Sequence, residues 1–536
     1  MVNKDVIETE VLIIGCGIAG ASTAMEAAKR GLKVTIVTKY SKPEESNTFY
    51  AQGGIVSLGK DDRPELLKKD MLETGDNINN PEAVEILAKE GKICVDEILI
   101  KELKIPFTRA SPDSLDYAQE AAHSRRRILH VKDTTGKTIE EKFIDKLESF
   151  SNVTILSDFT VVDLLTTPHH SKNPSSFYQK PRCVGAYVLN NQTRKVLKVF
   201  AAYTVLATGG CGAVYLYTSN PRGAIGDGYA LAYQAGARIV NMEYIQFHPT
   251  SLFHRDADSF LISESVRGEG ARLKTKEGFT FMENYNQKKE MAPRDEVTRA
   301  IYEEMTNSNS NYVVLDLASY AKIDIKKRFP NIYQTCLKYG IDITRESIPV
   351  VPAAHYCCGG VLVDTWGRTT LNDLYAVGEV ACTGVHGANR LASTSLLEGL
   401  VWGVRAAKDI ASIFSPKKNY RISDIYDWYY PNKEEEIDPA LINQDWLSIR
   451  NTMWNYTGII RTKKRLERAR ADLDYLRHRI DRFYKEARMD SEVVGLKHGI
   501  QVAMLINNAA RNNLISRGAH YIKQENKNVI EGKKNG

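Results

Sequence analysis

Three glycines near the N-terminus have the spacing of a phosphate-binding turn. Gly15, Gly17 and Gly20 form a G-x-G-x-x-G sequence directly after the apolar run at 11–14. In such a turn the first glycine permits a tight bend, the second lets backbone approach a pyrophosphate, and the third lets the helix pack against the strand. The N-terminus of that helix favours an anion. With a second strand at 33–37, the motif predicts a dinucleotide site.

Charged and polar side chains gather in two further stretches. Residues 120–133 contain Glu120, two histidines and three arginines, a pattern that is also typical of a solvated loop. Residues 241–354 carry the motifs FHPT, SESVRGEG and APRD among proline and glycine. A single histidine or arginine in such a motif is more often structural than functional. Together these polar groups predict a separate domain that covers a binding site.

Composition limits the class of protein and its ligands. The 536 residues, 43% apolar and 26% charged, are typical of a globular protein of roughly two to four domains. The net charge of +6 suits a small anionic ligand and is too diffuse to indicate nucleic acid. The eight cysteines have no C-x-x-C spacing, which indicates reduced thiols, a cytoplasmic protein and no metal site. Glu26 and the glycines interrupt the apolar run at 11–28, so we expect no membrane contact.

Alternating strands and helices must position these residues. Helices are predicted at 82–103 and 137–147, and strands at 153–156, 161–165 and 184–189 are predicted to form a small β insertion with a turn at 190–191. Residues 202–210 return to the parallel sheet, and 374–377 form a strand that ends beside Glu379. Asp227 opens a helix, as a hydroxyl ligand or a cap. Residues 414–440 indicate a linker, and Leu466, Ala469, Leu473, Leu476, Ile480 and Phe483 form the apolar stripe of a helical bundle.

Lys39 indicates which kind of dinucleotide the glycine turn binds. It follows the second strand, where an NAD-binding domain usually carries an acidic residue for the ribose hydroxyls. This departure argues against a simple NAD dehydrogenase.

The motifs also occur in a familiar order: GCGIAG, NTFYAQGG, ATGG, FHPT, SESVRGEGA, APRD, HYCCGGV, LYAVGE and HGANRLASTSLLE. This order resembles the fumarate reductase/succinate dehydrogenase flavoprotein family over residues 8–520, and most closely its aspartate-oxidising branch. The resemblance implies an α/β fold with a doubly wound FAD-binding domain at 1–240 and 355–415. It also implies an inserted α+β capping domain at 241–354 and a C-terminal helical bundle at 430–522. Apart from the resemblance, residues 523–536 are predicted to be a disordered tail.

The resemblance implies the cofactor and its contacts. The cofactor is FAD, and it is held without a covalent bond, because Asn47 stands where related subunits carry the histidine that links the flavin. The glycine turn and the resemblance together place these residues at the cofactor: Gly15, Cys16, Gly17, Ile18, Ala19, Gly20, Lys39, Asn47, Thr48, Phe49, Tyr50, Ala51, Gln52, Gly53, Gly54, Asp227, Glu379, Ser395 and Leu396.

The resemblance places a dicarboxylate substrate at Glu120, His248, Ser263, Arg294, His355 and Arg390. Arginines suit this task because each can bind a carboxylate with two parallel donors. The histidines and the serine add donors, and Glu120 is an acceptor for an α-ammonium group. The family also makes Arg294 the proton donor and acceptor, although a guanidinium scarcely deprotonates at its usual pKa.

Two positions depart from the family's pattern. Ala121 and Ala122 stand where Gly-Gly is common, which could shift the backbone beside Glu120. Ser263 stands where threonine is more common, so the hydroxyl is kept and a methyl group is lost.

Three functions are compatible with these residues. The first is oxidation of L-aspartate to iminoaspartate, with O₂ or fumarate as acceptor, in NAD biosynthesis, with quinolinate synthase as a candidate recipient of the product. The second is a soluble fumarate reductase or succinate dehydrogenase subunit, and the third is a flavin-dependent scaffold without activity. Glu120 and the adjacent HSRRR run favour the first over the second. The complete set of two arginines and two histidines disfavours the third.

Overall fold

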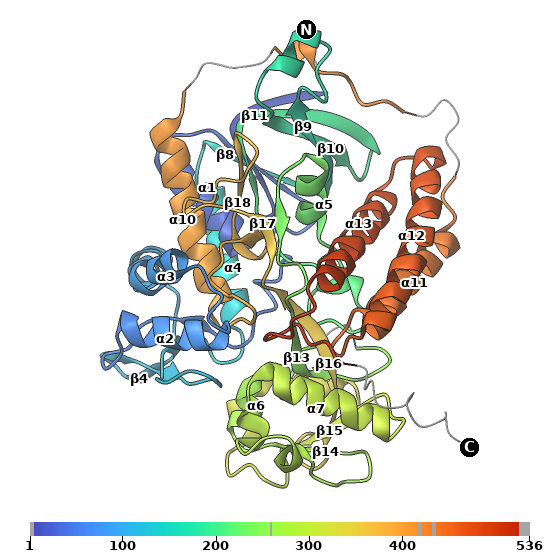
Figure 1. Ribbon diagram of the computed structural model, residues 1–536. Helices are drawn as coiled ribbons and strands as arrows, with labels where there is room; N and C mark the ends of the chain where they lie inside the picture. The colour runs from blue at the N-terminus through green and yellow to red at the C-terminus, as the bar shows by residue number, and fades with distance from the viewer. Residues whose placement is uncertain (1–4, 258–259, 416–420, 431–435, 525–536) are drawn as a thin grey trace, which may run out of the picture.

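We describe a computed structural model of the chain, which covers residues 5–257, 260–415, 421–430 and 436–524. A twisted central sheet lies between helices, a smaller capping domain lies at one end of it, and three C-terminal helices lie along one side (Figure 1). The functional question is which residues meet where these three parts join.

The central sheet is built around the first strand of the chain. Among the described residues it has seven strands, in the order β8-β2-β1-β11-β10-β9, with β18 beside β11. They are β1 (Val6–Ile14), β2 (Val34–Thr38), β8 (Val153–Ser157), β9 (Phe159–Thr167), β10 (Arg182–Asn190), β11 (Lys195–Leu206) and β18 (Leu374–Ala376). The run at 11–14 is buried because β1 pairs in parallel with β2 on one side and β11 on the other.

The strands predicted as a small insertion belong to this central sheet, so that prediction is wrong. β8 pairs in parallel with β2, while β10 and β9 continue the sheet by antiparallel pairing. The physical reason is the length of β11, whose residues 195–200 pair with β10 and whose residues 198–206 pair with β1. The predicted turn at 190–191 is confirmed between β10 and β11.

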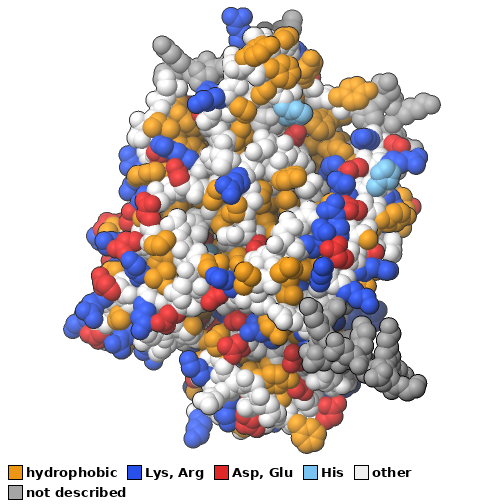
Figure 2. Space-filling view, in the orientation of Figure 1, with side chains coloured by type: hydrophobic (Ala, Val, Ile, Leu, Met, Phe, Trp, Pro, Cys, Tyr) orange, Lys and Arg blue, Asp and Glu red, His pale blue; other side chains and the backbone are white. Residues whose placement is uncertain are grey.

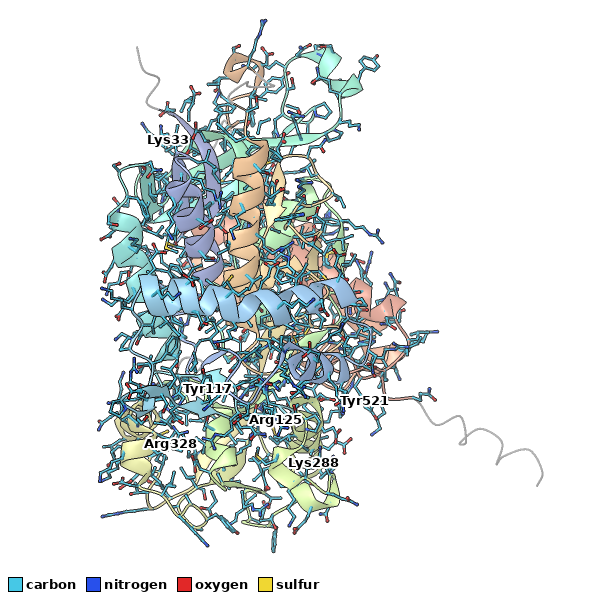
Figure 3. The ribbon with its side chains drawn as sticks, turned by 90° about the vertical axis from the view of Figure 1, so that its left-hand side faces the viewer. Lys33, Tyr117, Arg125, Lys288, Arg328 and Tyr521 are labelled. Atoms are coloured by element: carbon cyan, nitrogen blue, oxygen red, sulfur yellow. The ribbon has the colours of Figure 1, made fainter. Side chains whose placement is uncertain are left out.

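Helices cover the sheet and cross one another. α1 (Ile18–Lys29) and α10 (Ser395–Ile413) lie side by side, and α3 (Pro81–Cys94) crosses them (Figure 3). A Cβ on Gly403 would lie 2.1 Å from the Ser22 hydroxyl oxygen, so this glycine allows the close contact between α1 and α10. The predicted helix at 82–103 is confirmed as α3 with a π-helical continuation, Val95–Glu102, and the one at 137–147 as α4 (Thr135–Glu148).

Shorter elements complete this part of the chain. They are α2 (Pro64–Thr74), α5 (Asp227–Gln234) and the small sheets β3-β7-β6 (Ile55–Val56, Ile128–Leu129, Tyr117–Ala118), β12-β17-β19 (Ile239–Val240, Gly360–Leu362, Ala381–Cys382) and β4-β5 (Arg109–Ser111, Ser114–Leu115).

The capping domain is an antiparallel sheet with helices packed on it. Its strands lie in the order β13 (Ile245–Leu252), β16 (Ile348–Cys357), β15 (Val313–Asp316) and β14 (Arg272–Lys274). Its helices are α6 (Glu264–Gly268), α7 (Arg294–Asn307), α8 (Ile325–Arg328) and α9 (Pro330–Lys338). The boundary predicted between 354 and 355 falls inside β16. One strand therefore leads from the cap back to the part built on the central sheet, which we call the FAD-binding part after its expected ligand.

The cap and the FAD-binding part meet along a visible junction. In Figure 3, Tyr117 and Arg125 lie on one side of it and Arg328 and Lys288 on the other. The Asp133 carboxylate crosses the junction and accepts the backbone N–H of Asn331, at the start of α9, at 2.8 Å. The cap is therefore anchored to the FAD-binding part by at least one buried polar contact.

The C-terminal helices are α11 (Pro439–Tyr456), α12 (Lys463–Glu486) and α13 (Ser491–Asn512). The predicted apolar stripe lies on α12, where all its residues are buried except Phe483, which is partly buried. Lys and Arg side chains are numerous over these helices in Figure 2, but several pair within α12, as Arg470 does with Asp474. The predicted linker lies partly outside the described residues, and so does the predicted tail from 525 onward.

Candidate active site

The glycine turn after β1 forms one wall of a long cleft. Gly15 has a φ of +107°, and a Cβ there would lie 2.2 Å from the Ala207 carbonyl oxygen. A Cβ on Gly20 would lie 2.1 Å from the Gly15 carbonyl oxygen, so α1 packs directly against the turn. α1 begins at Ile18, whose N–H donates to the Thr48 hydroxyl at 3.0 Å, and Gly17 and Ile18 both line the cleft. The helix N-terminus therefore offers the cleft an anion-binding end.

This cleft brings together nearly all the predicted residues. All six predicted substrate residues line it, and so do the predicted cofactor residues except Gly20 and Phe49. Gly20 serves the packing of α1 instead. The Phe49 ring packs edge-on against Tyr50 and lies 5.6 Å from the Lys137 ammonium. Spacing along the chain does not reveal which side of a turn a residue faces, and a contact of these two residues with the cofactor stays a prediction.

The polar atoms of the cleft fit a dinucleotide flavin. Within the described chain, five buried side-chain oxygens that belong to its lining have no hydrogen-bond partner: those of Asn47, Gln52, Thr160, Thr208 and Asn220. An unpaired buried polar atom costs about 1–3 kcal/mol. The hydroxyl and amide groups of FAD would pair with such atoms, so the lining suits this cofactor.

One end of the cleft has compensated charges. The Lys39 ammonium lies 2.7 Å from the Asp227 carboxylate, and Nδ1 of His498, on α13, lies 3.0 Å from the other oxygen. Burial alone would raise the pKa of Asp227, but Lys39 and His498 hold it well below its usual range. The Asp227 side chain does not cap α5, whose N-cap is Gly226 with a φ of +90°.

The cap supplies two arginines to the other end of the cleft. Arg294 is the first residue of α7, and its Nε donates to the Glu264 carboxylate at 2.5 Å. The buried Arg267 lies 3.4 Å from the same carboxylate. Burial alone would raise the pKa of Glu264, but the two arginines lower it to about 2. Glu264 is therefore ionised and holds two cations. Ser263, the N-cap of α6, precedes it and accepts the N–H of Ser265 at 3.4 Å.

Arg390 comes from the FAD-binding part. Its Nη1 donates to the Ser395 hydroxyl at 3.1 Å, and its guanidinium lies 4.6 Å from the centre of the Tyr356 ring. Tyr356 in turn donates to the Glu398 carboxylate at 2.8 Å. Nε of Arg390 is buried and has no hydrogen-bond partner among the described residues. A buried guanidinium with an unused donor suits a carboxylate ligand.

His248 and His355 face each other, with ring centres 5.3 Å apart. Burial lowers the pKa of both well below the usual range, and neighbouring arginines lower it further, so both rings are neutral at pH 7. Nδ1 of His248 lies 3.2 Å from both the backbone N–H and the carbonyl oxygen of Thr250. The Ser219 hydroxyl lies 2.6 Å from Nδ1 of His355. The histidines thus add neutral polar groups to the site without adding positive charge.

Glu120 enters the same space from the small sheet β3-β7-β6. Gly53 lies just before β3, and a Cβ on it would lie 2.7 Å from Oε1 of Glu120. The Ser393 hydroxyl donates to Oε2 at 2.8 Å. Burial raises the pKa of Glu120, Glu264 adds to the rise, and Arg294 opposes it. A buried carboxyl group with a raised pKa therefore lies beside the arginines.

The backbone beside Glu120 explains why glycine is common there. Ala122 has a φ of +66°, and the N–H of Ala121 donates to the Glu264 carboxylate at 3.0 Å. A left-handed alanine costs about 1–2 kcal/mol, which glycine avoids. The Ala-Ala departure therefore keeps the loop geometry at the cost of backbone strain.

Glu379 lies between the two ends of the cleft. It follows β18, and its carboxyl accepts the Cys357 N–H at 3.0 Å and the Asn47 amide at 3.3 Å. Burial raises the pKa of Glu379 to about 7, although the Cys357 N–H and Arg390 lower it. This carboxyl group changes its charge near neutral pH.

Sequence reasoning missed several members of this cluster, including Glu264, Tyr356 and Gln246. Gln246 donates from Nε2 to the Arg390 carbonyl at 2.8 Å, and its Oε1 lies 3.4 Å from Nη1 of Arg294. It therefore links the arginine of the cap to that of the FAD-binding part. Each missed residue lies within or beside a motif quoted above, but only the folded chain shows that these residues meet.

The fold and the site define an FAD-dependent oxidoreductase. The family model "FAD binding domain" matches residues 10–396, and "Fumarate reductase flavoprotein C-term" matches residues 447–528. In the part of the chain that the structure describes, no helix is long and apolar enough to cross a membrane. Nor do three His, Cys, Asp or Glu side chains lie close enough there to hold a metal ion.

Known proteins specify the family. The chain is 40% identical to the L-aspartate oxidase of Acinetobacter baylyi over 96% of this chain and 92% of that protein. It is 40% identical to the L-aspartate oxidase of Halobacterium salinarum over 97% of each chain. The structure matches E. coli quinol fumarate reductase with a TM-score of 0.86 and 25% identity, over 98% of this chain and 94% of that one. Mycobacterium smegmatis Sdh1 matches with a TM-score of 0.80 and 28% identity, over 97% and 89%.

The chain belongs to the L-aspartate oxidase family, within the fumarate reductase/succinate dehydrogenase flavoproteins. The predicted family, the α/β fold class with its helical C-terminal part, and FAD as cofactor are confirmed.

Proposed function

We propose that this protein oxidises L-aspartate to iminoaspartate, with O₂ or fumarate as electron acceptor, in the first step of NAD biosynthesis through quinolinate. Glu120 carries the proposal, because it is a buried acceptor in the cleft that also holds Arg294 and Arg390. Two carboxylates need only the arginines, whereas a buried α-ammonium needs an acceptor as well. The two relatives from Acinetobacter baylyi and Halobacterium salinarum are both named L-aspartate oxidase, which supports the same substrate.

In this proposal the two arginines bind the two carboxylates of aspartate. Arg294 approaches from the cap and Arg390 from the FAD-binding part, so both parts must be in place before the substrate is held. The neutral rings of His248 and His355 add hydrogen-bond donors, and the Ser263 hydroxyl adds another. The cap also covers the cleft and excludes water, which strengthens each of these interactions.

FAD held along the cleft supplies the acceptor for the hydride that leaves the substrate Cα. Side chains of the protein accept and donate the protons of the reaction. Glu120 accepts a hydrogen bond from the α-ammonium and takes one of its protons. The raised pKa of Glu120 suits this uptake. Loss of the hydride from Cα then leaves the protonated imine, which releases a second proton to water to give iminoaspartate. With fumarate as acceptor a carbon atom must gain a proton, and Arg294, bound through Nε to Glu264, is the proposed donor.

A comparison of substrates tests the proposal. Full-length holoenzyme is given L-aspartate or succinate, and peroxide formation and fumarate reduction are followed separately. We expect turnover with L-aspartate, by both acceptors, and little or none with succinate. Oxidation of succinate without oxidation of aspartate would instead establish the fumarate reductase or succinate dehydrogenase alternative.

We further propose that FAD is held without a covalent bond. The Asn47 amide donates to Glu379 and offers no nucleophile for a flavin link. Acid precipitation should leave the flavin in the supernatant, and yellow colour in the washed pellet would contradict this.

We also propose that the enzyme acts in the cytoplasm and that quinolinate synthase receives its product. An imine hydrolyses in water, so direct transfer to the enzyme that uses it would protect it from hydrolysis. Full-length enzyme with and without quinolinate synthase, at equal aspartate turnover, should differ in the oxaloacetate released by hydrolysis; equal release would argue against transfer.

A further inference from the structure

The cofactor end of the cleft is touched by a part of the chain distant in sequence. His498 lies on α13, in the C-terminal helical part, and is 1% exposed. Its Nδ1 lies 3.0 Å from Asp227, whose other oxygen lies 2.7 Å from Lys39. Asp227 and Lys39 line the cleft and His498 does not. The histidine therefore contacts the cleft only through the carboxylate.

The same helix supports the turn that carries Asp227. Gly226 has a φ of +90°, and a Cβ on it would lie 2.8 Å from the Val502 side chain. A Cβ on Gly495 would lie 3.0 Å from the Ile225 side chain. α13 thus lies against the turn before α5 at two points besides His498. The position of Asp227 depends on the helical part being packed in place.

The chemistry of Asp227 makes its position important. Lys39 directly follows β2, where dinucleotide-binding folds hold the ribose hydroxyls of the ligand. A carboxylate there accepts hydrogen bonds from hydroxyls only if its oxygens are correctly aimed. Lys39 holds one oxygen and His498 the other, which fixes the orientation of the carboxylate plane.

We propose that His498 is a positioning residue for FAD, and that through Asp227 the C-terminal helical part forms part of the cofactor site. This inference rests on the proposed cofactor role of Lys39 and Asp227. It assigns a cofactor role to a segment that the sequence presents only as a packing helix, since His498 lies in none of the motifs that identify the flavin site.

The test measures the affinity of the full-length apoprotein for FAD by quenching of flavin fluorescence. His498→Ala should weaken FAD binding about tenfold, the effect of losing one hydrogen bond to a charged group. His498→Gln keeps a donor at similar reach and should recover affinity to within about threefold of the native protein. The rate of FAD release from diluted holoenzyme should rise in the same order.

Two further variants separate a cofactor role from general packing. Asn507→Ala removes a buried side chain of the same helix that bonds to Thr457 and Leu466, away from the cleft, and should lower stability without changing FAD affinity. Asp227→Ala should weaken binding by itself, and His498→Ala should then add little.

The outcomes are distinguishable. If Asp227→Ala leaves FAD affinity unchanged, the proposed cofactor role of Asp227 fails and the role of His498 fails with it. If Asp227→Ala weakens binding while His498→Ala and His498→Gln do not, only the inference about His498 is overturned. Equal losses in His498→Ala and Asn507→Ala, or additive losses in the double variant, would show that His498 acts on the fold alone.

Discussion

The two ends of the cleft both contain cations, but their charges are balanced differently. At the cofactor end, Asp227 is paired with Lys39 and His498. At the substrate end, Arg267 and Arg294 share one carboxylate, Glu264, and Arg390 keeps a buried donor without a partner among the described residues.

The difference indicates what each end binds. At the cofactor end the Asp227 carboxylate already has its partners, Lys39 and His498. This end therefore needs no further charge and suits uncharged hydroxyl groups. The substrate end has more cations than ionised carboxylates, so a bound anion would balance its charge. The site for a dicarboxylate can therefore be recognised by its excess of positive charge.

The largest expected effect follows from removing a substrate arginine. Arg294→Leu or Arg390→Leu should lower kcat/KM for aspartate at least a few hundredfold, roughly 3 to 5 kcal/mol, because a bidentate carboxylate contact is lost. FAD affinity should stay within about threefold. Steady-state kinetics and flavin titration on the same preparations measure both quantities.

Lys39→Met is the matched control at the other end. It should weaken FAD binding and leave kcat/KM of the fully loaded enzyme nearly unchanged. The contrast between the two ends would fail if an arginine variant kept near-normal kcat/KM, or if the arginine and lysine variants lost both properties alike.

Glu120→Gln should have the next largest effect, and a selective one. It keeps the size of the side chain and removes the charge that faces the ammonium, so aspartate oxidation should fall about 10²-fold, near 3 kcal/mol. Fumarate reduction by pre-reduced enzyme should change much less, because fumarate has no amine. Equal losses in the two assays would mean that Glu120 supports the fold or the flavin instead.

Glu379, between the two ends, should make the stability of the flavin-free protein depend on pH. Its folded pKa of about 7 lies above the usual 4.5, so between these values the folded state holds a proton that the unfolded state releases. This contribution to stability is complete below pH 4.5 and is lost as pH rises through 7.

Glu379→Gln should remove that dependence. Relative to the native protein, the variant should gain roughly 3 kcal/mol of unfolding free energy between pH 5 and pH 8, measured by urea unfolding of both apoproteins. A difference between the two proteins that stays constant with pH would show that Glu379 is ionised throughout this range.

The smallest effect concerns the loop beside Glu120. Ala122→Gly should stabilise the protein by about 1 kcal/mol, since the left-handed backbone is free of strain with glycine. Ala121→Gly, at a neighbour without a positive φ, should destabilise it by about 0.5–1 kcal/mol. Thermal unfolding of the two variants gives the sign of each effect, and the same sign for both would show that backbone strain is not what distinguishes these positions.

The sequence correctly predicted those structural features that depend on one short segment of the chain. The turn at Gly15–Gly17, the helices α3 and α4 and the stripe on α12 each depend on spacing within about one element. The strands 153–156, 161–165 and 184–189 were recognised as strands but assigned to the wrong sheet. Their sheet depends on β11, a partner elsewhere in the chain, which no local pattern specifies.

By itself, the sequence determined the order of strand, turn and helix, the residue types at the substrate end and the family, because these are carried by contiguous motifs. Only the tertiary structure decided that Glu264 lies between Arg294 and Arg267, that Ala122 is left-handed, and that His498 meets Asp227. These contacts join residues up to 271 positions apart. Their strength comes from burial, since a low dielectric makes a paired charge stable and an unpaired one costly, and burial exists only once the chain has folded.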